Sequence, residues 1–262
     1  MDVTGKRIII TGGGRGIGAS TLRAYVREGA KVVSLEIDPV SGQREVDVAN
    51  NQTSKGGEAM FVQCDISSPD SVNDAFAEAK HYLGGLDVFA NIAAIDFSSP
   101  AEDWSVQQMQ AIWGVNINGT ILTNQAACKI FIDEGQGNII NFASDVAMAG
   151  MPNGALYAAS KGAVLSWTRT IAKEWASKYN IRCNCVNPTM ATPMYETYLA
   201  SLSESDLAAF KAKEKQTVPL GGRMGDPDKD MAPVMLFLAS DASGFINGQI
   251  VPVNGGRIML HG

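Results

Sequence analysis

The chain has 262 residues, of which 45% are hydrophobic, and its net charge at pH 7 is −6. This length allows one large domain or two small ones, and the apolar fraction is sufficient for a sizeable core. The sequence contains no basic block that would favour nucleic acid, no apolar run near the ~18 residues of a membrane helix, and no signal peptide. We therefore expect a cytoplasmic protein that binds neither nucleic acid nor a membrane.

Strands and helices are predicted to alternate along the whole chain. Strands are expected at residues 7–11, 31–37, 59–63, 86–90, 138–143, 181–186 and 249–253. Helices are expected at residues 19–28, 69–82, 106–134, 154–178 and 226–239, with a short, poor helix or a loop within 38–58 and a helical flap at about 192–218. Such alternation favours a parallel sheet with helices on both faces. We predict a single doubly wound, Rossmann-type α/β domain over residues 1–262.

A glycine-rich turn joins the first predicted strand to the first predicted helix. Gly12, Gly16 and Gly18 lie in this turn, where glycines let the backbone approach a pyrophosphate and the helix N-terminus attracts it. A tight turn without a ligand is the alternative, but this position between a first strand and a helix favours nucleotide binding. Glu36 ends the second predicted strand, where an acidic group accepts the ribose hydroxyls of NAD and repels the extra phosphate of NADP. Arg15 favours NADP, since guanidinium pairs with phosphate; weighing both, we predict NAD.

Tyr157 and Lys161 are spaced so that both lie on one face of the predicted helix at 154–178. A phenol with its ordinary pKa of about 10 is a poor base at neutral pH, and a fixed positive charge nearby lowers that pKa. Our hypothesis is that Tyr157 is a general acid/base tuned by Lys161, and that Ser144 polarises the same substrate oxygen. An ordinary helical pair is the alternative, because a Tyr-x-x-x-Lys match is weak on its own.

Residue types suited to metal binding are scarce. The only histidines are His81 and His261, and neither stands among other ligand types. Cys183 and Cys185 alternate along a predicted strand, so we expect them to be buried strand residues. Zinc sites usually place two residues between paired thiolates. We predict no metal and no catalytic triad that depends on histidine.

Several motifs, in order and over essentially the whole chain, resemble those of the short-chain dehydrogenase/reductase family. They are Thr11-Gly12-x-x-x-Gly16-x-Gly18, Asp65-Ile66, Asn91-Ile92-Ala93-Ala94, Asn116, Ser144 with Tyr157 and Lys161, Asn187-Pro188 with Thr192, Gly222-Arg223-Met224-Gly225-Asp226-Pro227, Phe237-Leu238-Ala239-Ser240-Asp241 and Gly255-Gly256. The chain departs from the family pattern at Ile92, Ala94, Thr189 and Asn254. Thr189 replaces a glycine, and Asn254 stands where an aspartate often precedes the double glycine.

The resemblance implies hydride transfer between a nicotinamide and a carbinol or carbonyl carbon. It implies that Tyr157 exchanges the proton while Ser144 holds the substrate oxygen. Lys161 would lower the phenol pKa and bind the nicotinamide ribose, and Asn116 would support a water that links Lys161 to solvent. The expected catalytic residues are thus Asn116, Ser144, Tyr157 and Lys161. The expected cofactor-binding residues are Gly12, Arg15, Gly16, Ile17, Gly18, Glu36, Asp65, Ile66, Asn91, Ala93, Tyr157, Lys161, Pro188, Met190 and Thr192.

The substrate pocket is expected after the strand ends and in the flap. Pocket candidates there are Ile95, Asp96, Phe97, Asp145, Met148, Met151, Met190, Met194, Tyr195 and Tyr198. The predicted substrate contacts are Ser144, Asp145, Met151, Tyr157 and Met194. Met and aromatic side chains form an adaptable apolar wall, and no cluster of Arg or Lys surrounds the catalytic stretch. We predict that the substrate is a neutral, largely apolar secondary alcohol, such as a cyclic, terpenoid or steroid-like alcohol. Two alternatives stay open for Asp145: it accepts a hydrogen bond from a hydroxyl of a diol or sugar-like substrate, or it faces solvent.

Two other functions stay open at this point. A biosynthetic carbonyl reductase of the ketoacyl carrier-protein type would usually use NADPH, and Glu36 speaks against that cofactor. A nucleotide-sensing protein of the same fold would lack catalysis, and the complete set of four catalytic candidates disfavours it. In the family that this chain resembles, long helices pair between subunits, which implies a homotetramer.

Overall fold

The computed structural model describes residues 1–259, apart from the side chain of Met194. Within this range, seven parallel strands form one sheet in the order β3-β2-β1-β4-β5-β6-β7. The strands are β1 (Arg7–Thr11), β2 (Lys31–Glu36), β3 (Glu58–Gln63), β4 (Val88–Asn91), β5 (Gly137–Phe142), β6 (Ile181–Pro188) and β7 (Ile250–Val253). The strand order reverses between β1 and β4, which opens a crevice at their carboxyl ends. The predicted doubly wound fold is confirmed.

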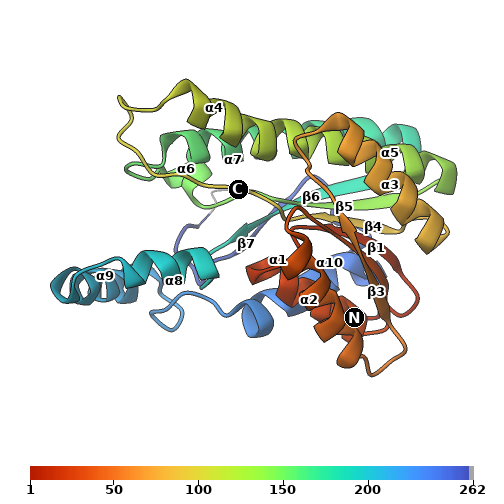
Figure 1. Cartoon of the computed structure of the whole chain (residues 1–262), viewed down its shortest axis with the longest axis horizontal. Coiled ribbons are helices and arrows are strands. Elements are labelled where there is room, and N and C mark those ends of the chain that lie inside the picture. Colours follow the sequence, from red (N-terminus) through yellow and green to blue (C-terminus); the bar gives the residue numbers. More distant parts are fainter. Residues whose placement is uncertain (260–262) are drawn as a thin grey trace.

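Helices cover both faces of the sheet (Figure 1). One face carries α1 (Gly16–Arg27), α2 (Pro39–Asn51) and α10 (Ala232–Ala239); the other carries α3 (Pro69–Leu83), α5 (Thr120–Glu134) and α7 (Ala155–Tyr179). The remaining helices are α4 (Val106–Ile112), α6 (Val146–Ala149), α8 (Pro193–Ala200) and α9 (Glu204–Thr217), and three short segments of other helical types lie at Trp113–Gly119, Pro227–Met231 and Asp241–Ser243. The predicted helical flap is formed by α8 and α9, which extend beside the sheet (Figure 1).

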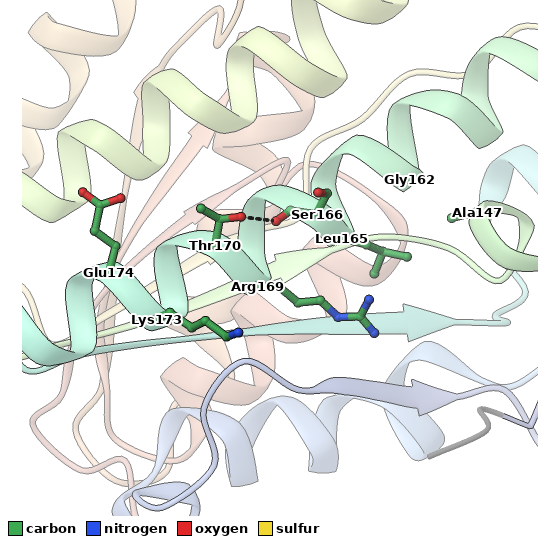
Figure 2. A pocket seen from close by; sticks show the side chains of 8 residues that line it. All are labelled: Ala147, Gly162, Leu165, Ser166, Arg169, Thr170, Lys173 and Glu174. Atoms are coloured by element: carbon green, nitrogen blue, oxygen red, sulfur yellow. Dashed lines mark hydrogen bonds between the residues drawn. The ribbon is translucent and has the colours of Figure 1, made fainter.

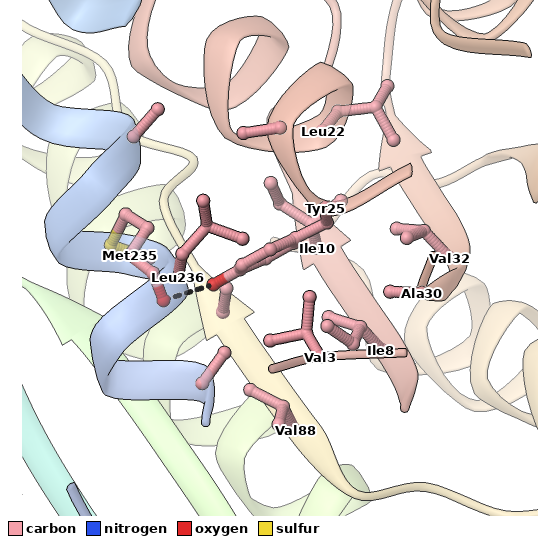
Figure 3. Close-up of a cluster of buried hydrophobic side chains, with 14 of the residues drawn as sticks. Val3, Ile8, Ile10, Leu22, Tyr25, Ala30, Val32, Val88, Met235 and Leu236 are labelled. Carbon is pink, nitrogen blue, oxygen red and sulfur yellow. Dashed lines mark hydrogen bonds between the residues drawn. The ribbon is translucent and has the colours of Figure 1, made fainter. Parts of the chain in front are cut away.

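The alternation of β1 side chains divides the core into two layers. Ile8 and Ile10 point toward α1 and α10, whereas Ile9 points toward the helices of the opposite face. In the first layer the ring of Tyr25 is fully buried, and its hydroxyl donates a 3.3 Å hydrogen bond to the main-chain carbonyl of Met235 in α10 (Figure 3). This bond satisfies the polar atom of an otherwise apolar cluster. Cys183 and Cys185 are buried in β6, as predicted.

Residues 39–51 form a regular helix where a poor helix or a loop was expected. The Asp38 side chain accepts hydrogen bonds from the main-chain N–H groups of Val40 and Ser41, and Pro39 occupies the first turn. This capping, together with packing of Val46 and Ala49 on the core, compensates for the weak apolar pattern.

The long helix expected at 106–134 is interrupted by a π-helical segment, Trp113–Gly119, between α4 and α5. The expected single helix is therefore divided into two, with Asn116 in the segment between them. Gly119 packs closely on Ile66, whose side chain would have to shift if a Cβ were added at 2.9 Å from it. Segments of this type often occur at functional sites, and this one carries Asn116.

None of the helices in the described residues is long and apolar enough to cross a membrane.

Candidate active site

A buried hydroxyl group fixes the turn after β4 to the end of β1, at the crevice between these two strands. Thr11 ends β1, and its Oγ1 donates to Oδ1 of Asn91 at 2.9 Å. The same Oγ1 accepts from the main-chain N–H groups of Ile92 and Ala93 at 3.0 and 3.1 Å. Asn91 also donates to Thr120 Oγ1 at 3.1 Å, which ties this turn to α5. The turn after β4 is thereby fixed beside the glycine-rich turn after β1.

The glycine-rich turn is too closely packed for larger residues. A Cβ on Gly18 would lie 1.9 Å from the carbonyl oxygen of Gly12, and a Cβ on Gly12 would lie 2.9 Å from Cα of Ala93. Helix α1 begins at Gly16, and its first turn contains no acidic residue and receives no side-chain cap within the described residues. Its free N–H groups and the helix dipole therefore favour a phosphate at this position.

Glu36 lies at the end of β2 against the glycine-rich turn. Its Oε2 accepts a hydrogen bond from Gly14 N at 3.1 Å, and its Oε1 accepts from the main-chain N–H groups of Ile37 and Asp38 at 2.9 and 3.3 Å. A carboxylate oxygen has about two acceptor sites, so Oε1 is fully used by these bonds and Oε2 keeps one site for a ribose hydroxyl. Arg44, which sequence reasoning missed, donates to Gly14 O at 3.4 Å and brings a second cation besides Arg15 to this turn.

These features fit a dinucleotide cofactor. The close-packed glycines and the uncapped helix would hold the pyrophosphate, and Glu36 would hold the adenosine ribose. Asp65 and Ile66 follow β3, with the Asp65 carboxylate accepting from Ser67 N at 2.9 Å. Pro188 is the last residue of β6, and Met190 and Thr192 follow it; Thr192 caps α8. A Cβ on Gly16 would be 3.4 Å from Pro193, so the start of the flap approaches the glycine-rich turn.

Tyr157 and Lys161 share the inner face of α7, as the spacing predicts. The Lys161 side chain is 3% exposed, its Nζ donates to Phe142 O at the end of β5 at 2.9 Å, and Nζ lies 5.6 Å from the centroid of the Tyr157 ring. Ser144 follows β5 two residues after Phe142 and hydrogen bonds with Tyr157, which lowers the phenol pKa. The structure thus brings the three predicted groups together.

The predicted tuning of Tyr157 by Lys161 is wrong for the protein without cofactor. Burial raises the pKa of Tyr157, the nearby Asp96 carboxylate raises it further, and only Ser144 acts in the opposite direction. Burial also lowers the pKa of Lys161 to about 8, opposed by Cys185 and Asp96. The physical reason is that a low-dielectric surrounding disfavours the charged form of each group. The free site consequently holds a protonated phenol.

Asn116 fixes the geometry around α7 with its side chain. Its Oδ1 accepts from Ile95 N, and its Nδ2 donates to Ile95 O, both at 2.9 Å. Nδ2 also donates to Ser160 Oγ at 3.0 Å, and Ser160 Oγ donates to Tyr157 O at 2.8 Å. Asn116 therefore joins the segment after β4 to the catalytic helix. The water that Asn116 was expected to support stays a prediction.

Asp145 is buried, so the expectation that its side chain faces solvent is wrong, while its contact with a substrate stays a prediction. The residue is 4% exposed, and its carboxylate accepts from Thr189 Oγ1 at 2.8 Å and from Asn254 Nδ2 at 3.1 Å. Burial raises its pKa, while the hydrogen bonds from Asn254 and Thr189 and the charge of Arg257 lower it. Sequence reasoning missed this network, although two of its members, Thr189 and Asn254, are departures from the family pattern.

The other predicted substrate contacts lie around this edge. Ser144 and Tyr157 are partly buried, whereas Met148 and Met151 are 37% and 38% exposed. The side chain of Met194 lies outside the described part of the chain. Met190 is buried in the core, so it contributes packing.

A surface hollow along α7 is separate from the site (Figure 2). It is lined by Ala147, Gly162, Leu165, Ser166, Arg169, Thr170, Lys173 and Glu174. None of the four catalytic candidates lines it.

Comparison with known proteins identifies the family. The family model described as enoyl-(acyl carrier protein) reductase matches residues 12–257. A 3-oxoacyl-[acyl-carrier-protein] reductase FabG of Chlamydia pneumoniae is 34% identical over 258 residues, which cover 98% of this chain and 99% of the relative. 3beta-hydroxysteroid dehydrogenase 1 of Eggerthella lenta is 32% identical over 263 residues, which cover 100% and 97%. The crystal structure of 3-ketoacyl-(acyl-carrier-protein) reductase from Brucella melitensis complexed with NADH has a TM-score of 0.86 and 30% identity, and covers 98% of this chain and 99% of that chain.

The fold and the site define a nicotinamide-dependent type of oxidoreductase. The chain belongs to the short-chain dehydrogenase/reductase family.

Replacing Asn254 with aspartate tests the buried network of Asp145, Thr189 and Asn254. In Asn254→Asp two carboxylates meet at Asp145, so we expect the pKa of the pair to rise further above the ordinary 3.8. A raised folded-state pKa gives stability at low pH that is lost as pH rises through the raised value. At pH 8 the free energy of unfolding should fall by at least ~1.4 kcal/mol, the equivalent of one pKa unit, with a smaller loss at pH 5.

Chemical denaturation at both pH values measures this difference. The double variant Asp145→Asn/Asn254→Asp keeps a single carboxylate in the network and serves as the control, which should recover most of the loss. Equal losses for Asn254→Asp at pH 5 and pH 8 would contradict the contact between the two side chains.

Proposed function

We propose that the protein is an NAD-dependent oxidoreductase that interconverts a secondary alcohol and its ketone. The observation that carries this proposal is the buried Lys161 beside Tyr157 and Ser144, next to a glycine-rich turn that fits a dinucleotide. Proton exchange needs a positioned acid/base, and the bound cofactor would supply the hydride chemistry.

The roles of the side chains follow from their surroundings. In the reduction direction, the protonated Tyr157 phenol donates its proton to the carbonyl oxygen that Ser144 holds. In the oxidation direction, Tyr157 first loses its proton to solvent, and a protonated Lys161 at 5.6 Å from the ring stabilises the resulting phenolate, which then accepts the hydroxyl proton. Asn116 positions α7 through Ser160. The raised pKa of Tyr157 keeps the phenol protonated, which is the form that the reduction direction needs.

NAD is the proposed cofactor because Glu36 lies where the adenosine ribose would bind. The extra phosphate of NADP would meet a carboxylate there, whereas the ribose hydroxyls of NAD would be accepted by it. Arg15 and Arg44 weigh toward NADP, since both lie at the glycine-rich turn. The Glu36 carboxylate is oriented by three main-chain N–H groups, so its acceptor atoms have fixed positions. The exposed Arg15 side chain, by contrast, can turn to solvent. We therefore give Glu36 more weight than Arg15 in the choice of cofactor.

We propose a neutral, largely apolar secondary alcohol as the substrate, with a cyclic alcohol as the first class to test. Exposed Met148, Met151 and Phe97 follow the strand ends around Ser144 and provide apolar surface. A relative named as a hydroxysteroid dehydrogenase supports this class. A ketoacyl carrier-protein reductase is the second candidate, since two of the similar proteins bear that name and one of them is complexed with NADH.

Glu36→Ala tests both the activity and the cofactor. Wild-type protein should reduce NAD in the presence of cyclic secondary alcohols, measured by absorbance of the reduced nicotinamide with NAD and with NADP. Without the carboxylate, the ratio of kcat/KM for NAD over NADP should fall at least about tenfold, the equivalent of roughly 1.4 kcal/mol. Glu36→Gln, which keeps the shape and removes the charge, should also lower the ratio.

Glu78→Ala is the matched control, because Glu78 is exposed on α3 far along the chain from the glycine-rich turn. An unchanged cofactor ratio in Glu36→Ala would refute the NAD assignment. Activity on ketoacyl thioesters, without oxidation of any simple alcohol, would favour the second candidate.

We also propose a homotetramer in which α5 and α7 contact further copies of the chain. The exposed side of α7 carries two hollows that are both lined by Ser166: one is largely apolar, and the other also contains Arg169, Lys173 and Glu174. Light scattering should give four times the 27.8 kDa of the chain. Ser166→Arg should lower this mass, whereas Ser177→Arg, exposed outside both hollows, should not. A monomeric wild-type mass would contradict the proposal.

A further inference from the structure

A short segment after β4, residues 95–99, is hydrogen bonded at both ends to elements of the site. At one end, both main-chain polar groups of Ile95 are hydrogen bonded to the Asn116 side chain at 2.9 Å. At the other end, Ser99 N donates to Asn153 O at 2.9 Å, in the turn that precedes the catalytic helix. The residues between, beginning with Asp96, are thereby held next to Tyr157 and Lys161.

Asp96 has an unused acceptor in this position. Its Oδ1 is buried and makes no hydrogen bond to any residue of the described chain. A buried carboxylate oxygen without a donor costs free energy, so this oxygen favours a ligand that brings a hydrogen-bond donor. The proximity to the reacting groups is reflected in their electrostatics, because the Asp96 charge raises the pKa of both Tyr157 and Lys161. Burial raises the pKa of Asp96 itself, opposed by Phe97 N and Lys161.

Asp145, the other carboxylate near Ser144, is instead held in a buried network of the protein's own donors. Its oxygens already accept hydrogen bonds from Thr189 and Asn254. Asp96 is thus the carboxylate of this edge that keeps a buried oxygen free, within the part of the chain that the structure describes.

We propose that Asp96 determines specificity by accepting a hydrogen bond from a second hydroxyl group of the substrate, so that the preferred substrates are diols or hydroxyketones. This inference rests on the proposed alcohol dehydrogenase activity and narrows its substrate class. An otherwise apolar substrate with one additional hydroxyl would pack on the apolar residues and donate a hydrogen bond to Oδ1 of Asp96.

The surrounding charges select a hydroxyl over other donors. An anionic group would be repelled by the Asp96 carboxylate. A cationic group would come close to Lys161 and be repelled by it, because the positive charge of Lys161 already lies near Asp96. A neutral hydroxyl donates one hydrogen bond without adding charge to a buried site.

Oxidation of matched substrates tests this role. The substrates are cyclohexanol, the cis and trans vicinal cyclohexanediols, and the corresponding vicinal amino alcohol, each with NAD. For the wild type, kcat/KM should be at least about tenfold higher for one diol isomer than for cyclohexanol, as expected for a charged acceptor that meets its donor. Asp96→Ala should abolish this preference: it removes a charge beside Tyr157 and Lys161 and so changes turnover of both substrates, but the ratio of kcat/KM for the preferred diol over cyclohexanol should fall at least about tenfold.

Two further variants separate hydrogen bonding from other effects. Asp96→Asn keeps one acceptor oxygen and should retain part of the diol preference. Asp103→Ala is the matched control, since Asp103 is an exposed aspartate of the same connection and its loss should leave both rates unchanged.

The outcomes distinguish the inference from the proposed function. Equal losses on cyclohexanol and on the diols in Asp96→Ala would show that Asp96 acts on Tyr157 and Lys161 only, and would overturn the substrate role. Oxidation without any diol preference, or preference for the amino alcohol, would also overturn it. Failure of the wild type to oxidise any of these alcohols with NAD or NADP would instead overturn the proposed function, and the inference with it.

Discussion

The buried ammonium group of Lys161 is the constraint on which the rest of the site depends. A cation that is 3% exposed is costly unless dipoles or opposite charges surround it. The Phe142 carbonyl at the end of β5 supplies one acceptor, and the Asp96 carboxylate supplies the opposite charge. These contacts hold the first turns of α7 against the carboxyl edge of the sheet. Tyr157, one helical turn earlier, is placed by the same contacts, and Asn116 reinforces the placement through Ser160.

A second buried charge organises the opposite side of this edge. Asp145 follows Ser144 directly, and its carboxylate joins Thr189 after β6 to Asn254 near the end of the chain. Thr189 and Asn254, which both depart from the family pattern, therefore belong to one hydrogen-bond network around Asp145. A glycine at position 189 has no hydroxyl to donate, and an aspartate at position 254 would place two carboxylates together. The amide and the hydroxyl supply the donors that a buried carboxylate at position 145 requires.

The fold and most of the site could be predicted from local signals. Strand and helix periodicity, the glycine-rich turn and the spacing of Tyr157 and Lys161 act over short stretches, and the structure agrees with them. Two features could not be predicted, because they depend on burial and on contacts between distant residues. The direction of the Tyr157 pKa shift follows from desolvation and from Asp96. The role of Asp145 follows from partners 44 and 109 residues away along the chain.

The central claim is that Tyr157 transfers the proton in the reaction, and its removal tests that claim most directly. Single-turnover oxidation of a cyclic secondary alcohol should be measured for the wild type and for Tyr157→Phe, with NAD binding measured in parallel. The phenylalanine ring keeps the packing on α7 but lacks the hydroxyl. We expect the rate to fall at least ~100-fold while NAD still binds, the scale of a lost general acid/base. A much smaller fall with NAD bound would contradict the account.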